Sequence, residues 1–475
     1  MIKDFYRQKI TSYLPYEPNS EQYTAIHTLS DFLTSRDCNG VMLFKGYAGT
    51  GKTTMLGALV KMMDALQRKV ILLAPTGRAA KVFAEYACHS ASTIHKKIYR
   101  QKSSSTASSA SSFFSLSPNL HTNTLFIVDE ASMISNEKSE SSNFGSGRLL
   151  DDLVCYVYSG ADCRLILSGD SAQLPPVSLT ESPALSAEYL KKYNLQVTEL
   201  QLTQVVRQQE ASGILINATG IRNALHSGEI AVYPTIRIEN FTDIRKIDGN
   251  DLIEEIASSY SRDGVDDTIV ISRSNKNANI YNTGIRNRIL YREDELSSGD
   301  RLMVVKNNYY WGGKENMETD FIANGEIIRI LRVRKMEHMY GFRFCNVLAR
   351  FADYEMEVEL KIMLDALHSE SPALSNESNE KLFAAVNEAY SNVRLKSERI
   401  KMIRNDPYFN AVQVKYAYAV TCHKAQGGQW SNVFLDIGYV TENMMGEDFY
   451  RWLYTAFTRA AKRLYLVNWR FGNKN

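Results

Sequence analysis

The sequence predicts an α/β protein with doubly wound parallel layers and an inserted β-rich domain. Short apolar runs alternate with helix-compatible segments, which is the pattern of parallel strands joined by crossover helices. A glycine-rich phosphate-binding sequence follows the first of these runs. Between about residues 299 and 410, β-like alternation gives way to a polar, helical stretch, and the α/β pattern returns only afterwards. We therefore expect this segment to be an insertion within an α/β domain.

Eight apolar runs are the expected buried strands, because each is short and is followed by a helical segment or a polar loop. They are residues 41–44, 70–74, 125–128, 165–167, 268–271, 417–421, 433–435 and 464–467. The Ser-rich stretch 103–117 offers little to bury, so it should be a surface excursion between two strands. Within the insertion, a long helical pattern covers about residues 381–404.

The most informative stretch is residues 46–54, which matches the phosphate-binding loop G-x-x-x-x-G-K-[ST] between an expected strand and an expected helix. Its N–H groups and the helix N-terminus suit phosphate oxygens. Lys52 should reach the β- and γ-phosphates of ATP, and the Thr53 hydroxyl should ligate Mg²⁺. The alternative is a glycine-rich turn that matches by chance. The expected nucleotide-binding residues here are Gly46, Ala48, Gly49, Thr50, Gly51, Lys52, Thr53 and Thr54.

Two adjacent carboxylates, Asp129 and Glu130, follow the run at 125–128. Behind a phosphate loop, the first acid commonly holds Mg²⁺ and the second orients and deprotonates the attacking water. Asp129 is therefore the expected magnesium residue and Glu130 the expected catalytic base. The alternative is an acidic pair that caps the next helix.

Three further residues are candidates for catalysis. Gln173 lies in a Gly-Asp and proline-containing loop after the run at 165–167, where its amide could sense the γ-phosphate. Arg207 and Arg459 lie beside apolar patches, and arginines from a second domain can neutralise charge in the transition state. A plain turn for Gln173 and surface ion pairs for the arginines are the alternatives.

Composition bounds the possible classes of protein. The 475 residues suggest two to four domains, and 44% hydrophobic and 23% charged residues are ordinary for a globular protein. The formal charge of +2 neither announces nor excludes a nucleic-acid partner. The six cysteines are scattered without a C-x-x-C pair, which argues against zinc and iron–sulfur sites. With no signal core and no apolar run of about 18 residues, we expect a cytoplasmic protein without a membrane partner.

Taken in order, the motifs resemble those of the superfamily 1B DNA helicases, in the RecD-like group that includes Dda-like and Pif1-related proteins. The segments that carry the resemblance are 19–22, 46–54, 74–80, 92–95, 129–132, 169–176, 206–208, 420–427 and 454–460. The resemblance implies two RecA-like parallel-sheet P-loop domains, a small 1B insertion and an SH3-like β-rich 2B insertion.

The resemblance also implies domain boundaries. Residues 1–195 would form RecA-like domain 1A, with the Ser-rich 1B insertion near 96–122. The segments 196–298 and 411–475 would form the two parts of RecA-like domain 2A, and 299–410 would be the 2B insertion between them.

The resemblance assigns further residues to each ligand. Gln22 would read the adenine, and Gln426 and Gly427 would meet the nucleotide from domain 2A together with Arg207 and Arg459.

Single-stranded DNA would cross both RecA-like domains at Pro75, Thr76, His95 and His423. The alternative for the two histidines is a capping or core-edge position.

The expected function is an ATP- and Mg²⁺-dependent DNA helicase that moves 5′ to 3′ on single-stranded DNA; the polarity rests on the resemblance alone. One alternative is a DNA-stimulated ATPase that translocates but unwinds poorly, since the expected pin region is largely serine. Others are a P-loop phosphotransferase for a small molecule and an RNA-directed enzyme. The expected partners are single-stranded and tailed duplex DNA, with single-strand-binding or repair and recombination proteins as further candidates.

Overall fold

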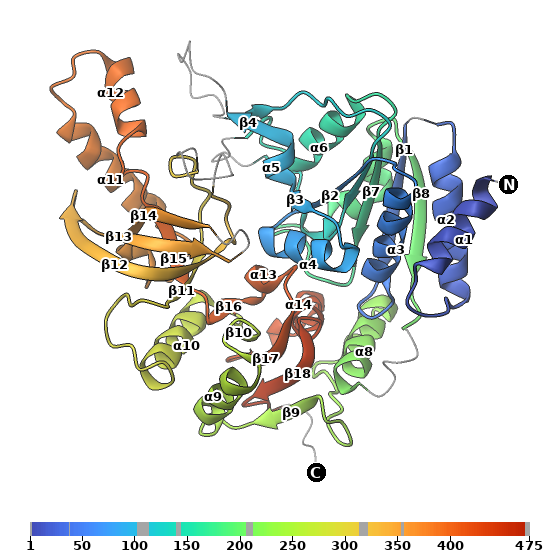
Figure 1. Ribbon diagram of the computed structural model, residues 1–475. Helices are drawn as coiled ribbons and strands as arrows, with labels where there is room; N and C mark the ends of the chain where they lie inside the picture. Colours follow the sequence, from blue (N-terminus) through green and yellow to red (C-terminus); the bar gives the residue numbers. More distant parts are fainter. Residues whose placement is uncertain are drawn as a thin grey trace.

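The computed structural model describes residues 2–37, 39–101, 114–138, 144–205, 212–312, 322–352 and 356–470. Two parallel sheets and a closed barrel form its framework (Figure 1). The first sheet lies on the right of the figure, the second lies below it, and the barrel lies on the left. The predicted α/β class with a β-rich insertion is thereby confirmed.

The first sheet has six parallel strands in the order β3-β2-β6-β7-β1-β8. The strands are β1 (Gly40–Gly46), β2 (Val70–Ala74), β3 (Ala91–Thr93), β6 (Leu125–Val128), β7 (Arg164–Gly169) and β8 (Gln196–Leu202). The helices of this part are α1 (Ile2–Ser12), α2 (Ser20–Thr34), α3 (Lys52–Ala65), α4 (Gly77–Ala87), α5 (Ile94–Ile98), α6 (Leu149–Tyr158) and α7 (Ala187–Lys191).

The second sheet has five parallel strands in the order β16-β10-β17-β18-β9. The strands are β9 (Ile244–Ile247), β10 (Thr268–Ser272), β16 (Ala419–Thr421), β17 (Trp430–Asp436) and β18 (Ala460–Val467). Its helices are α8 (Gly213–Ser227), α9 (Leu252–Asp263), α10 (Asn275–Arg288), α13 (Cys422–Ala425) and α14 (Glu447–Phe457). Strands from both sides of the insertion meet in this one sheet, as the sequence predicts.

The insertion is a closed five-stranded barrel. Its strands are β11 (Arg301–Val304), β12 (Ile327–Met339), β13 (Phe342–Phe351), β14 (Glu357–Met363) and β15 (Val412–Tyr416). The helical pattern expected over 381–404 is divided into α11 (Asn376–Ala389) and α12 (Lys396–Arg404). Ser391 and Asn392 lie in the break between these helices, where their short polar side chains compete with helical backbone hydrogen bonds.

Two of the predicted domain boundaries differ from the observed strands. Strand β8 pairs with β1, so the first sheet continues to Leu202, beyond the expected limit at residue 195. Strand β15 pairs with β11 and β14, so the barrel continues to Tyr416, beyond the expected limit at residue 410. Strand β8 escaped detection because it lies at a sheet edge and alternates polar with apolar residues.

A small two-stranded ribbon, β4 (Tyr99–Gln101) and β5 (Phe114–Leu116), occupies the expected place of the 1B element. Phe114 is buried, and its ring centroid lies 5.0 Å from that of Phe144 and 4.7 Å from that of Tyr309. Tyr309 follows β11 of the barrel, so this aromatic cluster joins the 1B ribbon to the 2B insertion. The connection between β4 and β5, including Phe113, lies outside the described residues.

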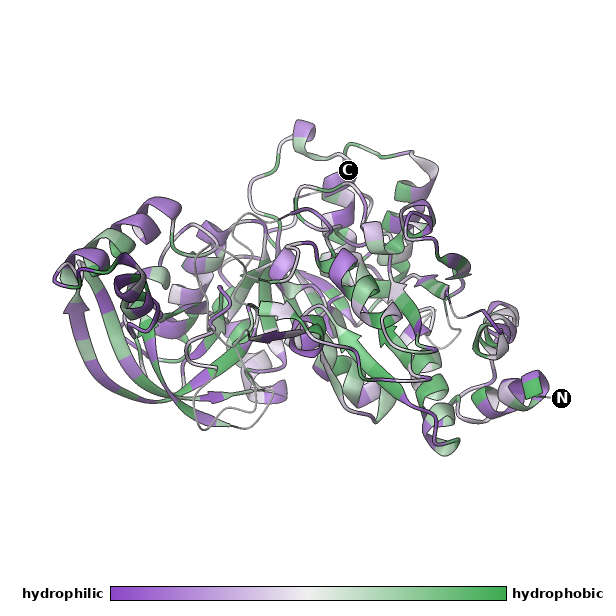
Figure 2. Cartoon of the chain, turned by 90° about the horizontal axis from the view of Figure 1, so that it is seen from above, coloured by the Kyte–Doolittle hydropathy of each residue, from purple (hydrophilic) through white to green (hydrophobic). Residues whose placement is uncertain are grey.

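Burial on both faces explains why the predicted strands are continuously apolar. On β1, Val41 and Leu43 face one hydrophobic cluster, whereas Met42 and Phe44 face another. Figure 2 shows the central strands largely green, with purple prominent on the outer helices. In the described ranges, no helix has the length and apolar character needed to cross a bilayer.

Candidate nucleotide site and nucleic-acid groove

The phosphate loop joins β1 to α3, and its shape depends on glycine. Gly49 and Gly51 have φ angles of 77° and 86°, in the left-handed region that glycine adopts without strain. A Cβ at Gly51 would lie 2.5 Å from the Tyr16 hydroxyl. The Lys52 ammonium donates to the carbonyl oxygen of Tyr47 across the loop at 3.2 Å. The side chain that would face the β- and γ-phosphates is thus held within the loop.

Gln22, in the first turn of α2, is hydrogen-bonded to the phosphate loop. Its Nε2 donates to the carbonyl oxygen of Thr50 at 3.1 Å, and its Oε1 accepts from the backbone N–H of Asn19 at 3.1 Å. Asn19 in turn caps α2 by accepting from the Gln22 N–H at 2.9 Å. Both ends of the Gln22 amide therefore have protein partners in this structure, and its contact with adenine stays a prediction.

Asp129 and Glu130 directly follow β6, and Asp129 is buried whereas Glu130 is half-buried. Asp129 Oδ1 accepts from the Ser168 hydroxyl at 2.8 Å, whereas Glu130 Oε2 is buried without a hydrogen-bond partner. Burial raises the pKa of both carboxyls, and the charge of Lys52 acts against this rise at each of them. These carboxylates and the loop lysine therefore share one electrostatic site, as the sequence predicts.

Arg459 approaches the same site from the second sheet. It is 2% exposed, and its guanidinium donates to the carbonyl oxygens of Thr455 and Gly428 at 3.1 and 3.2 Å. Its charge opposes the effect of burial on the pKa of Glu130, which places it electrostatically near the carboxylate of the other domain. Arg207, the second predicted arginine, lies outside the described residues.

The loop after β7 is hydrogen-bonded to residues of helix α14 and of the segment after α13, both in the domain of the second sheet. The Leu174 N–H donates to Thr455 Oγ1 at 2.8 Å, and the Leu174 carbonyl oxygen accepts from Gln426 Nε2 at 2.8 Å. The neighbouring Gln173 is 6% exposed, and its Oε1 is buried without a hydrogen-bond partner. Buried acceptors without partners are costly, so Gln173 and Glu130 both indicate a polar ligand in this cleft.

The residues predicted to hold Mg²⁺ both belong to the domain of the first sheet. Thr53 is in the first turn of α3, and Asp129 directly follows β6. Mg²⁺ at a phosphate loop is commonly bound by one or two protein oxygens together with substrate phosphates, so this small donor set fits the ion. Among the described residues, no cluster of three or more His, Cys, Asp or Glu side chains suits a metal.

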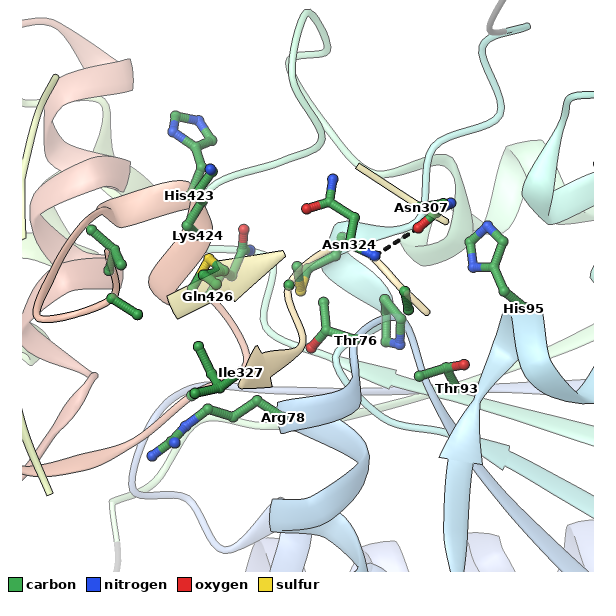
Figure 3. A pocket seen from close by; sticks show the side chains of 18 of the residues that line it. Thr76, Arg78, Thr93, His95, Asn307, Asn324, Ile327, His423, Lys424 and Gln426 are labelled. Carbon is green, nitrogen blue, oxygen red and sulfur yellow. Dashed lines mark hydrogen bonds between the residues drawn. The ribbon is translucent and has the colours of Figure 1, made fainter. Parts of the chain in front are cut away.

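A groove of about 360 Å³ lies where the domain of the first sheet, the domain of the second sheet and the barrel meet (Figure 3). These are the three parts of the molecule. The groove contains all four residues predicted to contact DNA, namely Pro75, Thr76, His95 and His423. The first sheet contributes the ends of β2 and β3, the second contributes α13, and the barrel contributes the residues before β12. These side chains come from segments far apart in the sequence, and only the fold brings them together.

Gln426 and Gly427 lie against residues of the first domain. Gln426 lines the groove, and a Cβ built at Gly427 would lie 2.9 Å from Ala79 and 3.4 Å from Thr76 Oγ1. Both residues thus lie beside the predicted DNA contacts at the start of α4. Their contact with the nucleotide stays a prediction.

Several groove residues were missed by the sequence analysis. Lys424 follows His423 within the same motif, and burial lowers its pKa to about 8. Asn324 lies in the turn before β12, where its N–H donates to Asn307 Oδ1 at 2.6 Å. Two signals in the sequence could have pointed to these residues. They are the position of Lys424 inside the 420–427 motif and the Asn-Gly turn that contains Asn324.

His95 is a neutral groove residue. Its ring centroid lies 4.9 Å from Phe144 and 5.7 Å from Tyr99, and burial lowers its pKa to about 4. An imidazole in this setting remains uncharged near neutral pH. It therefore offers a ring face or a hydrogen bond, and not a positive charge, to a ligand in the groove.

Comparison with known proteins shows that two segments of the chain match models of known domain families. An AAA domain model matches residues 17–233, and a UvrD-like helicase C-terminal domain model matches residues 416–467. These matches cover the phosphate loop, the acidic pair and the second half of the split sheet. The second of these segments is similar to the C-terminal domain of UvrD-like helicases. The resemblance drawn from the motifs is thereby confirmed.

Two similar proteins are the ATP-dependent RecD2 DNA helicase of Deinococcus radiodurans and the ATP-dependent DNA helicase dda of Enterobacteria phage T4. They are 25% and 24% identical over 90% and 60% of this chain. The chain spans only 46% and 61% of the length of these relatives. A solved Pif1 helicase from Bacteroides is similar with a TM-score of 0.48 at 15% identity, over 96% of this chain and 93% of that one.

Proposed function

We propose that the protein is an ATP- and Mg²⁺-dependent DNA helicase that moves 5′ to 3′ along single-stranded DNA and separates duplex DNA. The observation that carries this proposal is the pairing of two sites at one domain junction. Lys52 of the phosphate loop and Arg459 of the second sheet's domain both act on the charge of Glu130, and a groove is lined by residues of all three parts. A ligand that draws the two sheets together at the cleft would also change the groove.

The cleft residues have complementary roles in hydrolysis. Bound ATP supplies the phosphoanhydride bond whose hydrolysis drives the cycle. Lys52 binds the β- and γ-phosphates, and Glu130 accepts the proton of the attacking water at its free Oε2. Gln173 orients that water through its unpartnered Oε1, while Arg459 neutralises charge that develops in the transition state. Thr53 and Asp129 would hold Mg²⁺, which would supply positive charge to neutralise the phosphates.

The groove suits a nucleic-acid strand held without sequence readout. Thr76 Oγ1, Gln426, Lys424 and Asn324 offer hydrogen bonds or charge to phosphates, and the His95 ring offers a stacking face. The two named relatives are both ATP-dependent DNA helicases, which supports DNA as the strand. The polarity follows from the superfamily 1B relationship alone.

Unwinding of tailed duplexes tests the proposal directly. Duplexes with a 5′ tail, a 3′ tail or no tail are incubated with ATP and Mg²⁺, and strand separation is followed by fluorescence. We expect separation of the 5′-tailed duplex only, and no separation when ATP is replaced by a non-hydrolysable analogue. Separation of the 3′-tailed duplex alone would contradict the polarity, and no stimulation of ATPase by any DNA would contradict the function.

A second candidate is a DNA-stimulated ATPase that translocates but unwinds poorly. The observation that favours it is the burial of Phe114, which removes one aromatic ring from the expected pin. DNA-stimulated ATP turnover without strand separation in the same assay would support this candidate. A small-molecule phosphotransferase would show no DNA stimulation, and it leaves the three-part groove without a role.

We also propose a cytoplasmic location. Cys88, Cys155, Cys163, Cys345 and Cys422 are free thiols. Free thiols are typical of a reducing compartment. Single-strand-binding and repair or recombination proteins remain the candidate protein partners, and pull-down with DNA digested by nuclease would test them.

A further inference from the structure

The hydroxyl of Tyr454 lies where two loops of the first sheet meet a helix of the second. Tyr454 is 1% exposed on α14. Its oxygen accepts from the backbone N–H of Ala48 in the phosphate loop at 2.9 Å. The same hydroxyl donates to Asp170 Oδ2, in the loop after β7, at 2.6 Å. One side chain therefore connects three segments that the sequence analysis assigned to separate motifs.

Each partner of this hydroxyl is otherwise fixed. Asp170 is 1% exposed, and its Oδ1 accepts from the Ala172 N–H at 2.9 Å. Burial holds the pKa of Tyr454 well above its usual range, so the hydroxyl keeps the proton that it donates to Asp170. The buried Asp170 carboxylate and the part-buried Ala48 amide would both lose a partner if this hydroxyl were removed.

A continuous set of contacts links this hydroxyl to the groove. Gln426, which lines the groove, donates to the carbonyl oxygen of Leu174, and the Leu174 N–H donates to Thr455, the neighbour of Tyr454. Arg451, one turn earlier on α14, donates to the carbonyl oxygen of Ser171 at 2.6 Å. The 170–174 loop is thus bound along its length by residues of the second sheet.

A second contact from the same domain reaches the phosphate loop. The guanidinium carbon of Arg222 on α8 lies 4.4 Å from the ring centroid of Tyr47, which precedes Ala48. Helices α8 and α14 both pack on the second sheet. A movement of that sheet is therefore transmitted to two adjacent residues of the phosphate loop, Tyr47 and Ala48.

We propose that Tyr454 is a positioning residue that couples occupancy of the groove to alignment of the phosphate loop. This inference rests on the proposed function. When a strand in the groove shifts α13 and Gln426, the 170–174 loop and α14 move with them. Through its two hydrogen bonds, the Tyr454 hydroxyl then moves Asp170 and the Ala48 amide as one unit. Both groups lie beside the Gln173 and Glu130 acceptors. Tyr454 touches neither the nucleotide nor the strand, and it acts through these partners.

The test compares Tyr454→Phe with Tyr450→Phe. Tyr450 lies one turn away on α14, and its hydroxyl donates at 2.8 Å to the carbonyl oxygen of Ala231, in its own domain. Both variants lose one buried hydroxyl from one helix, so a merely structural effect appears in both. We measure the ratio of ATP turnover with and without saturating single-stranded DNA. This ratio should fall about tenfold in Tyr454→Phe, the effect of a hydrogen bond of about 1.4 kcal/mol, and stay near wild type in Tyr450→Phe.

A double variant adds a second readout. Tyr454→Phe with Asp170→Asn should lose no more DNA stimulation than the more severe single variant, because the two groups act as one contact. If Tyr454→Phe does not fold, Asp170→Asn alone should show the lost stimulation. An unchanged ratio in Tyr454→Phe, an equal loss in Tyr450→Phe or additive losses in the double variant would each overturn the inference. Wild-type protein without DNA stimulation would instead contradict the proposed function.

Discussion

Lys52 supplies a positive charge at the expected phosphate site, because a hydrogen bond to Tyr47 holds its ammonium within the loop. Replacing it by alanine should lower DNA-stimulated ATP turnover at least tenfold, since such a contact contributes at least ~1.4 kcal/mol to the barrier. Affinity for single-stranded DNA, measured by fluorescence anisotropy, should survive because Lys52 does not line the groove. Lys45→Ala is the control, since Lys45 pairs with Glu199 outside the loop. Retention of more than about a tenth of the turnover in Lys52→Ala would contradict the assignment.

Glu130 keeps one buried oxygen free, as a base that takes a proton from water requires. Glu130→Gln preserves the shape but cannot accept that proton. We expect ATP to bind while hydrolysis becomes very slow, so that a closed complex with ATP accumulates on DNA. Nucleotide binding by equilibrium dialysis and single-turnover hydrolysis separate these two steps, with the exposed Glu137→Gln as the control. Loss of ATP binding would instead assign Glu130 a structural role.

His95 makes stability depend on pH in a definite direction. Its folded pKa of about 4 lies below the ordinary value of 6.5, so the unfolded chain binds the proton more tightly. The stability from neutral His95 is fully present above pH 6.5 and is lost as pH falls towards 4. Between pH 7.5 and 5.5 this loss amounts to about 1 kcal/mol. Urea unfolding of wild type and His95→Gln should show the smaller pH dependence in the variant, and equal dependence would contradict the argument.

At the scale of elements, the turn before β12 forms the barrel's wall of the groove. Asn324→Asp would place a negative charge beside the path proposed for DNA phosphates. The affinity for single-stranded DNA should fall about fivefold, as expected for about 1 kcal/mol of repulsion near a protein surface. Asn346→Asp on β13 adds the same charge to the barrel outside the groove lining and should bind like wild type. Equal affinities of the two variants would remove the turn from the DNA site.

The elements that the sequence missed share one physical property. Strands β3, β8 and β9 each lie at the edge of a sheet, where one side of the strand has no neighbour. Edge strands carry polar residues, as in the Gln196–Leu202 sequence, and so lack the apolar run of a central strand. Seven of the eight predicted runs lie within strands and the run 417–421 overlaps β16, since double-sided burial leaves a clear local signature.

At the scale of the whole molecule, a buried ionic joint fixes the barrel on the second sheet. Asp300, which is fully buried just before β11, accepts from Arg286 Nη2 at 2.9 Å and Arg292 Nη1 at 2.8 Å. Tyr418, between β15 and β16, also donates to it at 3.1 Å. The joint thus ties together both points at which the chain crosses between barrel and sheet.

Removing the charge at this joint should be far more costly than removing an exposed one. Asp300→Asn leaves the buried Arg286 and the half-buried Arg292 without a charged partner and should lower the free energy of unfolding by at least about 3 kcal/mol. Glu377→Gln removes the exposed partner of the exposed Lys381 and should cost less than about 1 kcal/mol. Urea denaturation followed by tryptophan fluorescence measures both. Equal costs would show that the joint does not stabilise the barrel's attachment.

The sequence alone determined the α/β class, the split of the second sheet, the phosphate loop and its acidic pair. Each of these depends on residues adjacent in the chain, where glycine conformations, apolar runs and helix starts act locally. Only the tertiary structure decided that Gln426 lies at the groove and that Tyr454 joins Ala48 to Asp170. Tyr454 and Asp170 are 284 positions apart, so no local pattern encodes their contact. Packing of the two domains decides it, because these buried polar groups find their partners across the domain boundary.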